Sequence, residues 1–307
     1  MSSSTARSAP VAAALAAALI AVPAAEAKKF DVKPGKGTLQ KAIDKARNGD
    51  KLKLEKKGVY KGGVVIEKRL TITGPSDRKK LPTINGQCRV AFTMLVLSSP
   101  VTIQNLKVTG ASDEAGGTYG GADINFIEGG AGAAIGVKLD DGCGVQYGVN
   151  VFDTGDVLID ENEMKGYDDA GVYVGGIRDP NTVVEVTDNV AEQNNRGILI
   201  EDSFGNAGIL VSNNTASGQD NGFTPVGVFL FNSDGVVVAG NTTDSNAFAG
   251  VWADQNSDDN RIIDNTASGN GTTAQGGPGA DLVNDGQRNC GSGNSFGTTM
   301  GNPLGAC

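Results

Sequence analysis

The chain has 307 residues, a formal net charge of −9 and no histidine, so every mechanism that needs an imidazole is excluded. The charge is unevenly spread: residues 28–107 carry 19 basic and 6 acidic side chains, whereas residues 108–307 carry 6 basic and 28 acidic ones. The acidic part would repel phosphate, so we expect no nucleic-acid partner. The basic end is either a solvated cap or a patch that docks onto an anionic wall polymer or membrane surface.

Residues 1–27 have the pattern of an export signal. Arg7 precedes an apolar run over residues 11–22, and Ala25-Glu-Ala27 matches the A-x-A cleavage motif. The run is too short to span a bilayer, and nothing later in the chain approaches a span. We therefore expect a protein that starts near Lys28, is secreted to the extracellular space or the cell envelope or periplasm, and is not an integral membrane protein.

Residues 28–64 are expected to form an N-terminal cap. Residues 38–47 predict an amphipathic helix, because Leu39, Ala42, Ile43 and Ala46 fall on one stripe. The first strands follow it, from Lys51-Leu-Lys-Leu54 onward. A stack of strands exposes an apolar, unpaired end, which such a helix would cover.

Residues 65–307 are expected to form one elongated repeat domain. A four-residue motif recurs every 23 to 30 residues: a glycine, an apolar residue, any residue and a second apolar residue. Each copy predicts a half-buried strand. The copies begin at Gly121, Gly148, Gly171, Gly197, Gly227, Gly250 and Gly279. No single turn of this length can bury its apolar face alone, so the turns must stack into one core.

Within each turn an apolar run ends in asparagine, and these residues predict a structural ladder at one corner of the stack. They are Asn162, Asn189, Asn214, Asn241 and Asn265, with Asn294 in a degraded last copy. Stacked asparagine side chains can bond to one another and to the backbone of the bend.

With these repeats, the chain resembles the right-handed parallel β-helix proteins of the pectin-lyase-like type, including NosD-like chains with PbH1-type repeats. The resemblance implies an all-β fold, a single-stranded right-handed parallel β-helix with an N-terminal capping helix. It also implies that the glycine-led strand is the first of each coil and lines the cleft used by the lyases. The same scaffold hosts enzymes, binders and fibres, so the resemblance alone does not fix the function.

Four cysteines in an exported chain suggest two disulfides. Cys290 and Cys307 bracket the final segment and would close the C-terminal end, which leaves Cys88 to pair with Cys143, although sequence alone permits three connectivities. Cysteine without histidine argues against a soft-metal site, so no metal site is assigned and a copper role is disfavoured.

A Ca²⁺-dependent polysaccharide lyase or epimerase is the enzymatic alternative, and it would make Ca²⁺ the cofactor. In the resembled pectate lyases, acidic side chains hold Ca²⁺ and an arginine or lysine acts as base. The candidates here are Arg196, Glu201, Asp202 and Asp254. The arginine motif of that family is absent, and carboxylates on a solvated strand face are usually only surface.

Aromatic residues recur at the outward positions of the glycine-led strands. One column reads Asp123, Asn150, Tyr173, Leu199, Phe229, Trp252 and Asp281, with Phe152 and Phe231 in the next column. We expect Tyr173, Phe229, Trp252, Phe231 and Phe152 to stand on one exposed face, where pyranose rings could stack. The alternative is that these rings only stabilise neighbouring strands or are covered by loops.

The sequence therefore predicts an exported, non-catalytic monomer that binds polysaccharide along this aromatic face. The two alternatives are the Ca²⁺-dependent lyase or epimerase and a purely structural or adhesive surface solenoid.

Overall fold

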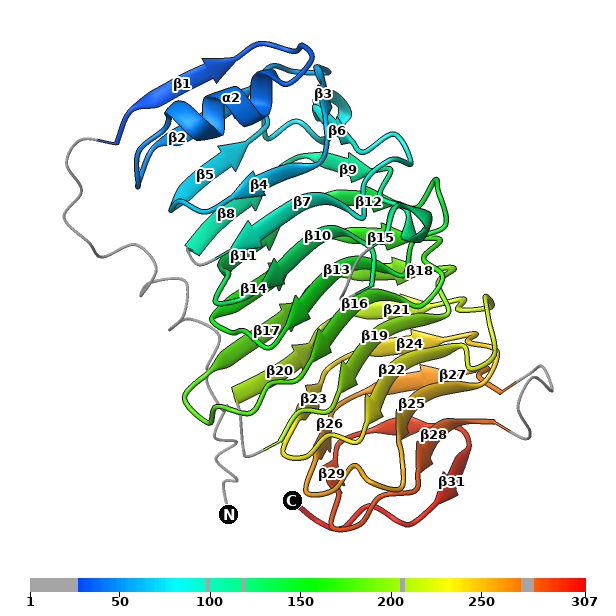
Figure 1. The fold of residues 1–307 in the computed structure, drawn as a ribbon. Helices are drawn as coiled ribbons and strands as arrows, with labels where there is room; N and C mark the ends of the chain where they lie inside the picture. The colour runs from blue at the N-terminus through cyan, green and yellow to red at the C-terminus, as the bar shows by residue number, and fades with distance from the viewer. Residues whose placement is uncertain (1–26, 98–99, 117–119, 205–207, 272–278) are drawn as a thin grey trace, which may run out of the picture.

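The computed structural model describes residues 27–97, 100–116, 120–204, 208–271 and 279–307. In these ranges the strands form three parallel sheets that wind into a right-handed β-helix, the fold class that the sequence predicts (Figure 1). The export signal expected over residues 1–27 lies outside the described residues except for Ala27. None of the helices in the described ranges is long and apolar enough to cross a membrane.

Each full coil passes once through each sheet, and the sheets are numbered here in that order. Sheet 1 contains β4 (Val64–Ile66), β7 (Phe92–Leu97), β10 (Ala122–Ile127), β13 (Tyr147–Phe152), β16 (Ala170–Gly175), β19 (Arg196–Glu201), β22 (Val226–Phe231), β25 (Ala249–Ala253), β28 (Ala280–Asn284) and β31 (Thr299–Gly301). Sheet 2 contains β1 (Lys29–Val32), β2 (Lys51–Leu54), β5 (Leu70–Thr73), β8 (Pro100–Gln104), β11 (Ala131–Ile135), β14 (Val157–Asp160), β17 (Val183–Thr187), β20 (Gly208–Ser212), β23 (Val237–Ala239), β26 (Arg261–Ile263) and β29 (Cys290–Ser292). Sheet 3 contains β3 (Val59–Lys61), β6 (Thr83–Asn85), β9 (Lys107–Thr109), β12 (Lys138–Asp140), β15 (Glu163–Lys165), β18 (Val190–Glu192), β21 (Thr215–Ser217), β24 (Thr242–Asp244), β27 (Thr266–Ser268) and β30 (Ser295–Phe296).

The helix α2 (Thr38–Lys45) lies across the N-terminal end of the stack (Figure 1). Leu39 and Ile43 point into the main core and are buried. The helix ends at Lys45 and not at the expected residue 47, because Ala46 already has extended backbone angles. Lys68 fixes this end: its Nζ donates to the carbonyl oxygens of Ile43, Asp44 and Ala46. Two short 3₁₀ turns, η2 (Arg78–Lys80) and η3 (Asp113–Ala115), lie in loops.

The recurring glycine of sheet 1 is explained by the close approach of the next coil. A Cβ atom on Gly148 would lie 2.5 Å from the carbonyl oxygen of Gly171, and one on Gly197 would lie 2.6 Å from that of Gly227. Neither glycine has a left-handed backbone, so space and not a positive φ requires glycine there.

The register of sheet 1 corrects the first and last expected repeats. Ala122 pairs with Tyr147 and Ile124 with Val149, which sets Asp123 opposite Gly148. In the same way Asp281 lies opposite Gly250. The copies of the motif expected to begin at Gly121 and Gly279 are therefore wrong by two residues, because an aspartate occupies the glycine position in the first and last copies.

A ladder of asparagines runs along the corner between sheets 2 and 3. Each side chain donates from Nδ2 to Oδ1 of the next over Asn162, Asn189, Asn214, Asn241, Asn265 and Asn294, at 2.9 to 3.2 Å. The backbone N–H of each donates to the same oxygen. The buried bends are thereby satisfied without water.

A second ladder follows the corner between sheets 3 and 1. The backbone N–H of each member donates to the side-chain oxygen of the next, in the order Asn194, Gln219, Asn246, Asn270 and Asp281. Asp281 ends this ladder and also accepts from the backbone of Thr298 in the last coil. A third, shorter series of serines, Ser203, Ser233 and Ser257, lies at the remaining corner.

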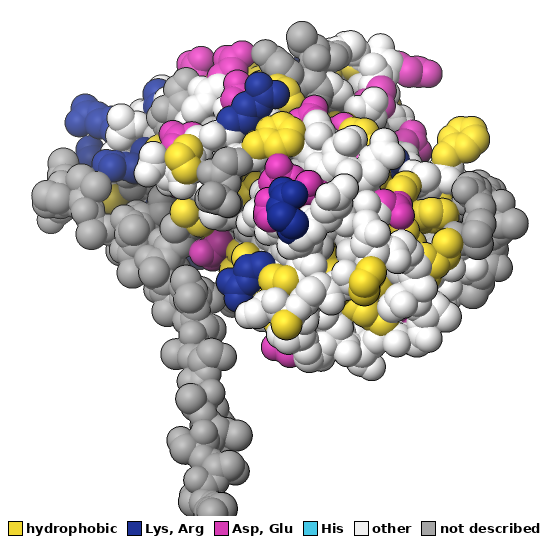
Figure 2. All heavy atoms as spheres, turned by 90° about the horizontal axis from the view of Figure 1, so that it is seen from below, with side chains coloured by type: hydrophobic (Ala, Val, Ile, Leu, Met, Phe, Trp, Pro, Cys, Tyr) yellow, Lys and Arg dark blue, Asp and Glu magenta, His cyan; other side chains and the backbone are white. Residues whose placement is uncertain are grey.

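The two disulfides lie far apart along the stack. Cys290 and Cys307 join the last strand of sheet 2 to the chain terminus, 17 residues on. Beside this link a hollow of about 460 Å³ is lined by Phe296, Met300 and Leu304, among others. Figure 2 views the molecule from this end and shows hydrophobic side chains at its surface.

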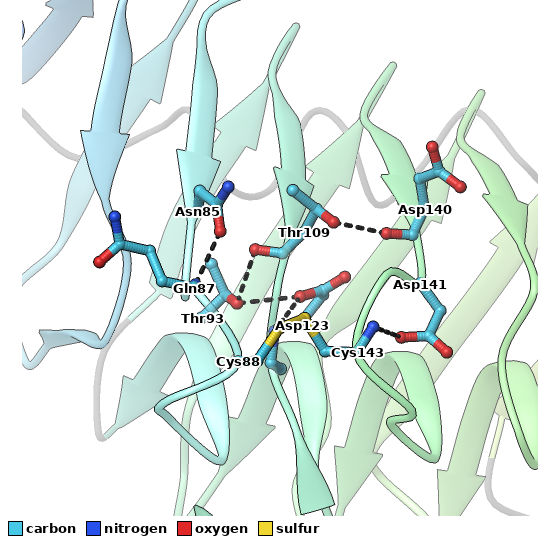
Figure 3. Close-up of a disulfide and its surroundings, with 10 residues drawn as sticks. Asn85, Gln87, Cys88, Thr93, Thr109, Asp123, Asp140, Asp141 and Cys143 are labelled. Carbon is cyan, nitrogen blue, oxygen red and sulfur yellow. Dashed lines mark hydrogen bonds between the residues drawn. A yellow bond between two sulfur atoms is a disulfide. The ribbon is translucent and has the colours of Figure 1, made fainter.

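The Cys88–Cys143 disulfide lies beside a buried carboxylate (Figure 3). Asp123 is fully buried; its Oδ1 accepts from the hydroxyl of Thr93 at 2.9 Å and from the N–H of Ala111 at 3.1 Å. Its Oδ2 accepts from the hydroxyl of Tyr167 at 2.8 Å. Desolvation dominates over these hydrogen bonds and raises the pKa of Asp123 to about 6.

Candidate functional site

The outer face of sheet 1 carries three columns of side chains, because residues that pair across the parallel strands stack on one another. The middle column contains Asn125, Asn150, Tyr173, Leu199, Phe229, Trp252 and Val283. Asp123 and Asp281 were expected in this column. Their carboxylates instead accept the hydrogen bonds described above. The column beside it contains Ile127, Phe152, Gly175, Glu201 and Phe231, and the one before it contains Ala122, Tyr147, Ala170, Arg196, Val226, Ala249 and Ala280.

The rings on this face contact one another across neighbouring coils. Phe229 and Trp252 stack with their centroids 4.4 Å apart and their planes 13° apart. Phe248 and Phe231 flank this pair, at 4.9 Å from Trp252 and 5.7 Å from Phe229 respectively. On the neighbouring strands β13 and β16, the ring centroids of Tyr147 and Tyr173 lie 4.6 Å apart. These six rings are called the aromatic band below.

The band is less exposed than the sequence suggests. Tyr173 is 8% exposed and Phe229 5% exposed, so the expectation that both stand on an open face is wrong. The reason is packing within the face, where they form a second apolar cluster with Tyr147, Leu199 and Phe248. Phe231 is 39% exposed and Trp252 is partly buried, so these two are the accessible rings of the band. Phe152, on the same face but outside the band, is also partly buried.

Arg196 joins the aromatic rings to the charged groups. Its guanidinium forms an ion pair with Asp169, donates to Thr224 Oγ1 at 2.8 Å and lies 5.5 Å from the centre of the Phe229 ring. Its side chain is only 19% exposed. A guanidinium neutralised and held in this way positions its neighbours and is poorly placed to remove a proton.

Glu201 and the two tyrosines complete the polar side of the face. Burial raises the pKa of Glu201, and the nearby charge of Asp202 adds to this, while a hydrogen bond from Tyr173 opposes it. Burial also raises the pKa of both Tyr147 and Tyr173, and neighbouring carboxylates raise it further. Both phenols are therefore neutral at ordinary pH and act as hydrogen-bond donors.

The carboxylates proposed for Ca²⁺ are engaged in local hydrogen bonds. Asp254 is 6% exposed and accepts from Ser257 Oγ at 2.6 Å and from the N–H of Asn232 at 3.0 Å. Asn232 also donates from Nδ2 to Asp202 at 2.5 Å, so it bridges the two carboxylates. Over the described part of the chain, no three acidic, cysteine or histidine side chains gather closely enough to hold a metal ion.

Several side chains of this face were missed from the sequence. Tyr147, Asp169, Thr224, Phe248 and Asp285 all contact the band or its partners, and Trp252 donates from Nε1 to Asp285 at 3.1 Å. Reading the residue before each repeat glycine would have placed Tyr147 and Arg196 in one column. The others lie in loops, where no repeat pattern marks them.

The face starts with a pair of amides. Asn150 donates from Nδ2 to Asn125 Oδ1 at 2.7 Å. Within the described residues, the remaining polar atoms, Asn125 Nδ2 and Asn150 Oδ1, are buried without a hydrogen-bond partner. A donor and an acceptor are thus unpaired beside the tyrosines of the band.

Comparisons with known proteins give one family and a consistent fold. A family model described as "Periplasmic copper-binding protein (NosD)" matches residues 117–299, more than half of the chain. The solved structure of pectate lyase Pel9A is similar with a TM-score of 0.59 at 9% identity, over 84% of this chain and 75% of that one. The alginate lyase from Paenibacillus sp. str. FPU-7 gives 0.50 at 14% identity, over 91% of this chain and 99% of that one. Among curated protein sequences, none matches significantly. At these identities the likeness to the two lyases shows the fold alone.

Proposed function

The chain belongs to the NosD family of parallel β-helix proteins, and on that premise we propose that it is an exported, non-catalytic protein that binds polysaccharide along the aromatic band. The observation that carries this proposal is the stacked pair Phe229 and Trp252, with accessible Phe231 beside it and carboxylates around it. Export is supported by the signal pattern of residues 1–27 and by the two disulfides.

The donor set of this chain does not fit the copper that the family description names. Copper favours imidazole, thiolate and thioether ligands. The chain has no histidine, and both cysteine pairs form disulfides. Met94 and Met164 are buried in the apolar core, Met300 lies at the C-terminal end, and Met1 is outside the described residues. No copper-dependent step is therefore derived for this protein.

The geometry favours sugar binding through a narrow strip of rings. Tyr173 and Phe229 act as the buried support, and Trp252, Phe231 and Phe152 offer the accessible ring surface. Aromatic rings of this kind bury the C–H faces of a pyranose, while carboxylates and amides accept its hydroxyl protons. Glu201 and Asp285 supply such carboxylates nearby.

The arrangement favours binding over catalysis. A lyase of the Ca²⁺-dependent type needs a free base and a cluster of metal ligands. Here Arg196 is bound to Asp169, and Asp254 is fixed in its turn by Ser257. The lyase alternative predicts an unsaturated product that absorbs in the ultraviolet, the epimerase alternative predicts an inverted uronate without such absorption, and both predict loss of activity in Arg196→Ala.

The proposal is tested by calorimetric titration with neutral and acidic oligosaccharides, including those from pectate and alginate, on which the two similar enzymes act. We expect Trp252→Ala and Phe231→Ala each to weaken binding about tenfold, since each removes an accessible ring. Val59 is an exposed apolar residue at the N-terminal end. The variant Val59→Ala is therefore the matched control and should bind as the parent does. Equal affinity in all four proteins would contradict the assignment of the site, and absence of binding would favour a structural solenoid.

A further inference from the structure

We propose that the capped N-terminal end of the β-helix docks onto an anionic lipid membrane surface and orients the molecule end-on to it. The proposal rests on charge and placement at this end and is independent of the polysaccharide site. The residues that carry it are called the basic cap: Lys28, Lys29, Lys33, Lys36, Lys41, Lys45, Arg47, Lys51, Lys53, Lys56, Lys57 and Lys61.

The basic cap is concentrated in a short part of the chain. Residues 28–61 hold these twelve basic side chains and only four acidic ones, whereas residues 108–307 hold 6 basic and 28 acidic. Every basic side chain of the cap is exposed except Lys51, which is partly buried. Because sequence position follows the axis of a solenoid, this difference becomes a charge separation along the molecule.

The fold gathers these side chains at one end. Lys29 of β1 pairs in register with Lys51 of β2, and Lys53 follows on the same outward face of sheet 2. The outer side of α2 presents Lys41 and Lys45 while its other side packs on the core. Figure 1 shows β1, α2, β2 and β3 together at this end, so the basic residues on these elements are gathered at the end of the stack.

The charges of the cap are left available. The ion pairs formed among the described residues involve Arg78, Lys80, Lys107, Lys138, Arg196 and Arg288, and none involves a basic residue between Lys28 and Lys61. The buried acid of this region, Asp50, accepts from the backbone N–H groups of Lys28 and Arg47. The Asp50 carboxylate therefore bonds to backbone groups and forms no ion pair with a lysine ammonium group among the described residues.

The chemistry of the end favours a membrane over a sugar polymer. Of its two aromatic residues, Tyr60 is fully buried and Phe30 is partly buried, so this end lacks the row of neighbouring rings that lies on sheet 1. Val59 is 61% exposed between Lys57 and Lys61, which gives an apolar contact among the charges.

The acidic body determines the orientation. Anionic lipid attracts each lysine near its surface and repels the carboxylates of the later coils. The favourable pose therefore places α2 toward the lipid and the last coil away from it. Trp252 in β25 lies seven strands beyond β4 in sheet 1, about 34 Å along the axis at 4.8 Å per strand.

The test measures sedimentation of the exported, disulfide-bonded protein with vesicles of phosphatidylcholine alone or mixed with phosphatidylglycerol. We expect binding only to the mixed vesicles, and loss of binding as salt is raised, since the attraction is screened within about 10 Å at 0.1 M salt. The triple variant Lys29→Gln, Lys41→Gln, Lys53→Gln should lower the partition coefficient about a hundredfold, because each cation contributes about fivefold. The matched triple Lys165→Gln, Arg178→Gln, Arg261→Gln removes the same charge from exposed sites on the body and should lower binding far less, because these sites do not face the lipid in the end-on pose.

Three outcomes would overturn the proposal. The first is equal binding to both kinds of vesicle, and the second is an equal loss of binding in the two triple variants. The third is that the same lysines bind soluble pectate while the protein does not bind vesicles, which would assign the cap to a polymer. Unchanged unfolding midpoints in both triples show that the fold is intact. Lipids carrying a bromine quencher should leave the fluorescence of Trp252, the only tryptophan, unchanged, and quenching would contradict the end-on pose.

Discussion

At the scale of single residues, Asp123 makes the stability of the fold depend on pH. It is fully buried beside the Cys88–Cys143 disulfide, and burial raises its pKa to about 6. The unfolded chain releases this proton near pH 3.9. The folded state therefore holds the proton more tightly, so the contribution is complete below the unfolded pKa and is lost as pH rises through 6.

We expect this one group to lower the free energy of unfolding by about 2 kcal/mol between pH 4 and pH 7. Urea unfolding of the parent and of Asp123→Asn at several pH values measures the effect. The amide keeps the shape and cannot ionise, so the difference between the two curves isolates Asp123 from the other carboxylates. Parallel curves across this range would show that Asp123 does not titrate as described.

Asn214 tests whether the asparagine ladder stabilises the stack. Its Oδ1 accepts from both the N–H and the Nδ2 of Asn189, and its own Nδ2 donates to Val186 and Asn241. Asn214→Ala leaves these buried partners unsatisfied and should cost about 3 kcal/mol. The exposed Asn256→Ala should change the free energy of unfolding by less than about 0.5 kcal/mol. Similar losses in the two variants, measured by urea unfolding, would refute a structural role for the ladder.

The same ladder shows what single residues reveal in a sequence. Asn162 to Asn265 could be found because one residue type recurs after an apolar run. The second ladder ends at Asp281, only 11 residues after Asn270. Its first four members mix asparagine with glutamine, although their steps of 25, 27 and 24 residues are just as regular. A search for any side-chain carbonyl at that period, and not for asparagine alone, would have detected it.

At the scale of the strands, the glycine column of sheet 1 sets how closely the coils approach. A Cβ atom on Gly197 would lie 2.6 Å from the carbonyl oxygen of Gly227 and 2.7 Å from the side chain of Ala216. Gly197→Ala should therefore cost about 3 kcal/mol, since both neighbours belong to the packed interior. Gly208 in β20 has its nearest such contact at 3.4 Å, so Gly208→Ala serves as control and should be neutral or slightly stabilising.

Thermal unfolding of the two glycine variants gives the comparison directly. A large drop in midpoint for Gly197→Ala alone is the expected result. If both substitutions were tolerated, the coils would have room to separate, and the repeat glycine would need another explanation.

The fold was predictable from strand periodicity because every coil must bury the inward-facing apolar residues of its strands, and this repeats one pattern along the sequence. The site was predictable only in part. The recurrence of Tyr173, Phe229 and Trp252 indicated one face, but their exposure depends on side chains from columns and loops that the repeat does not specify, such as Tyr147 and Phe248. Arg196 and Asp254 were candidates by type and position, yet their partners Asp169 and Ser257 decide what they can do.

At the scale of the whole molecule, the chain repeats one coil structure along its length and closes its two ends differently. Each coil contacts mainly its neighbours, so the N-terminal helix and the C-terminal disulfide close the two places where a neighbour is missing. The charge difference that the sequence shows between residues 28–107 and 108–307 becomes a difference between two ends of one elongated body. The proposed membrane docking depends on the basic cap, and the proposed polysaccharide binding depends on the aromatic band and the carboxylates beside it.

The central claim, polysaccharide binding on the outer face of sheet 1, is tested most directly by the fluorescence of Trp252. It is the only tryptophan, it stacks on Phe229, and its Nε1 donates to Asp285, so a sugar on this face must alter its surroundings. Titration with neutral and acidic oligosaccharides, with and without Ca²⁺, should give a saturable shift with at least one glycan, and Phe231→Ala should weaken it. A spectrum that stays constant across the whole panel would contradict the claim and leave the aromatic band as packing between strands.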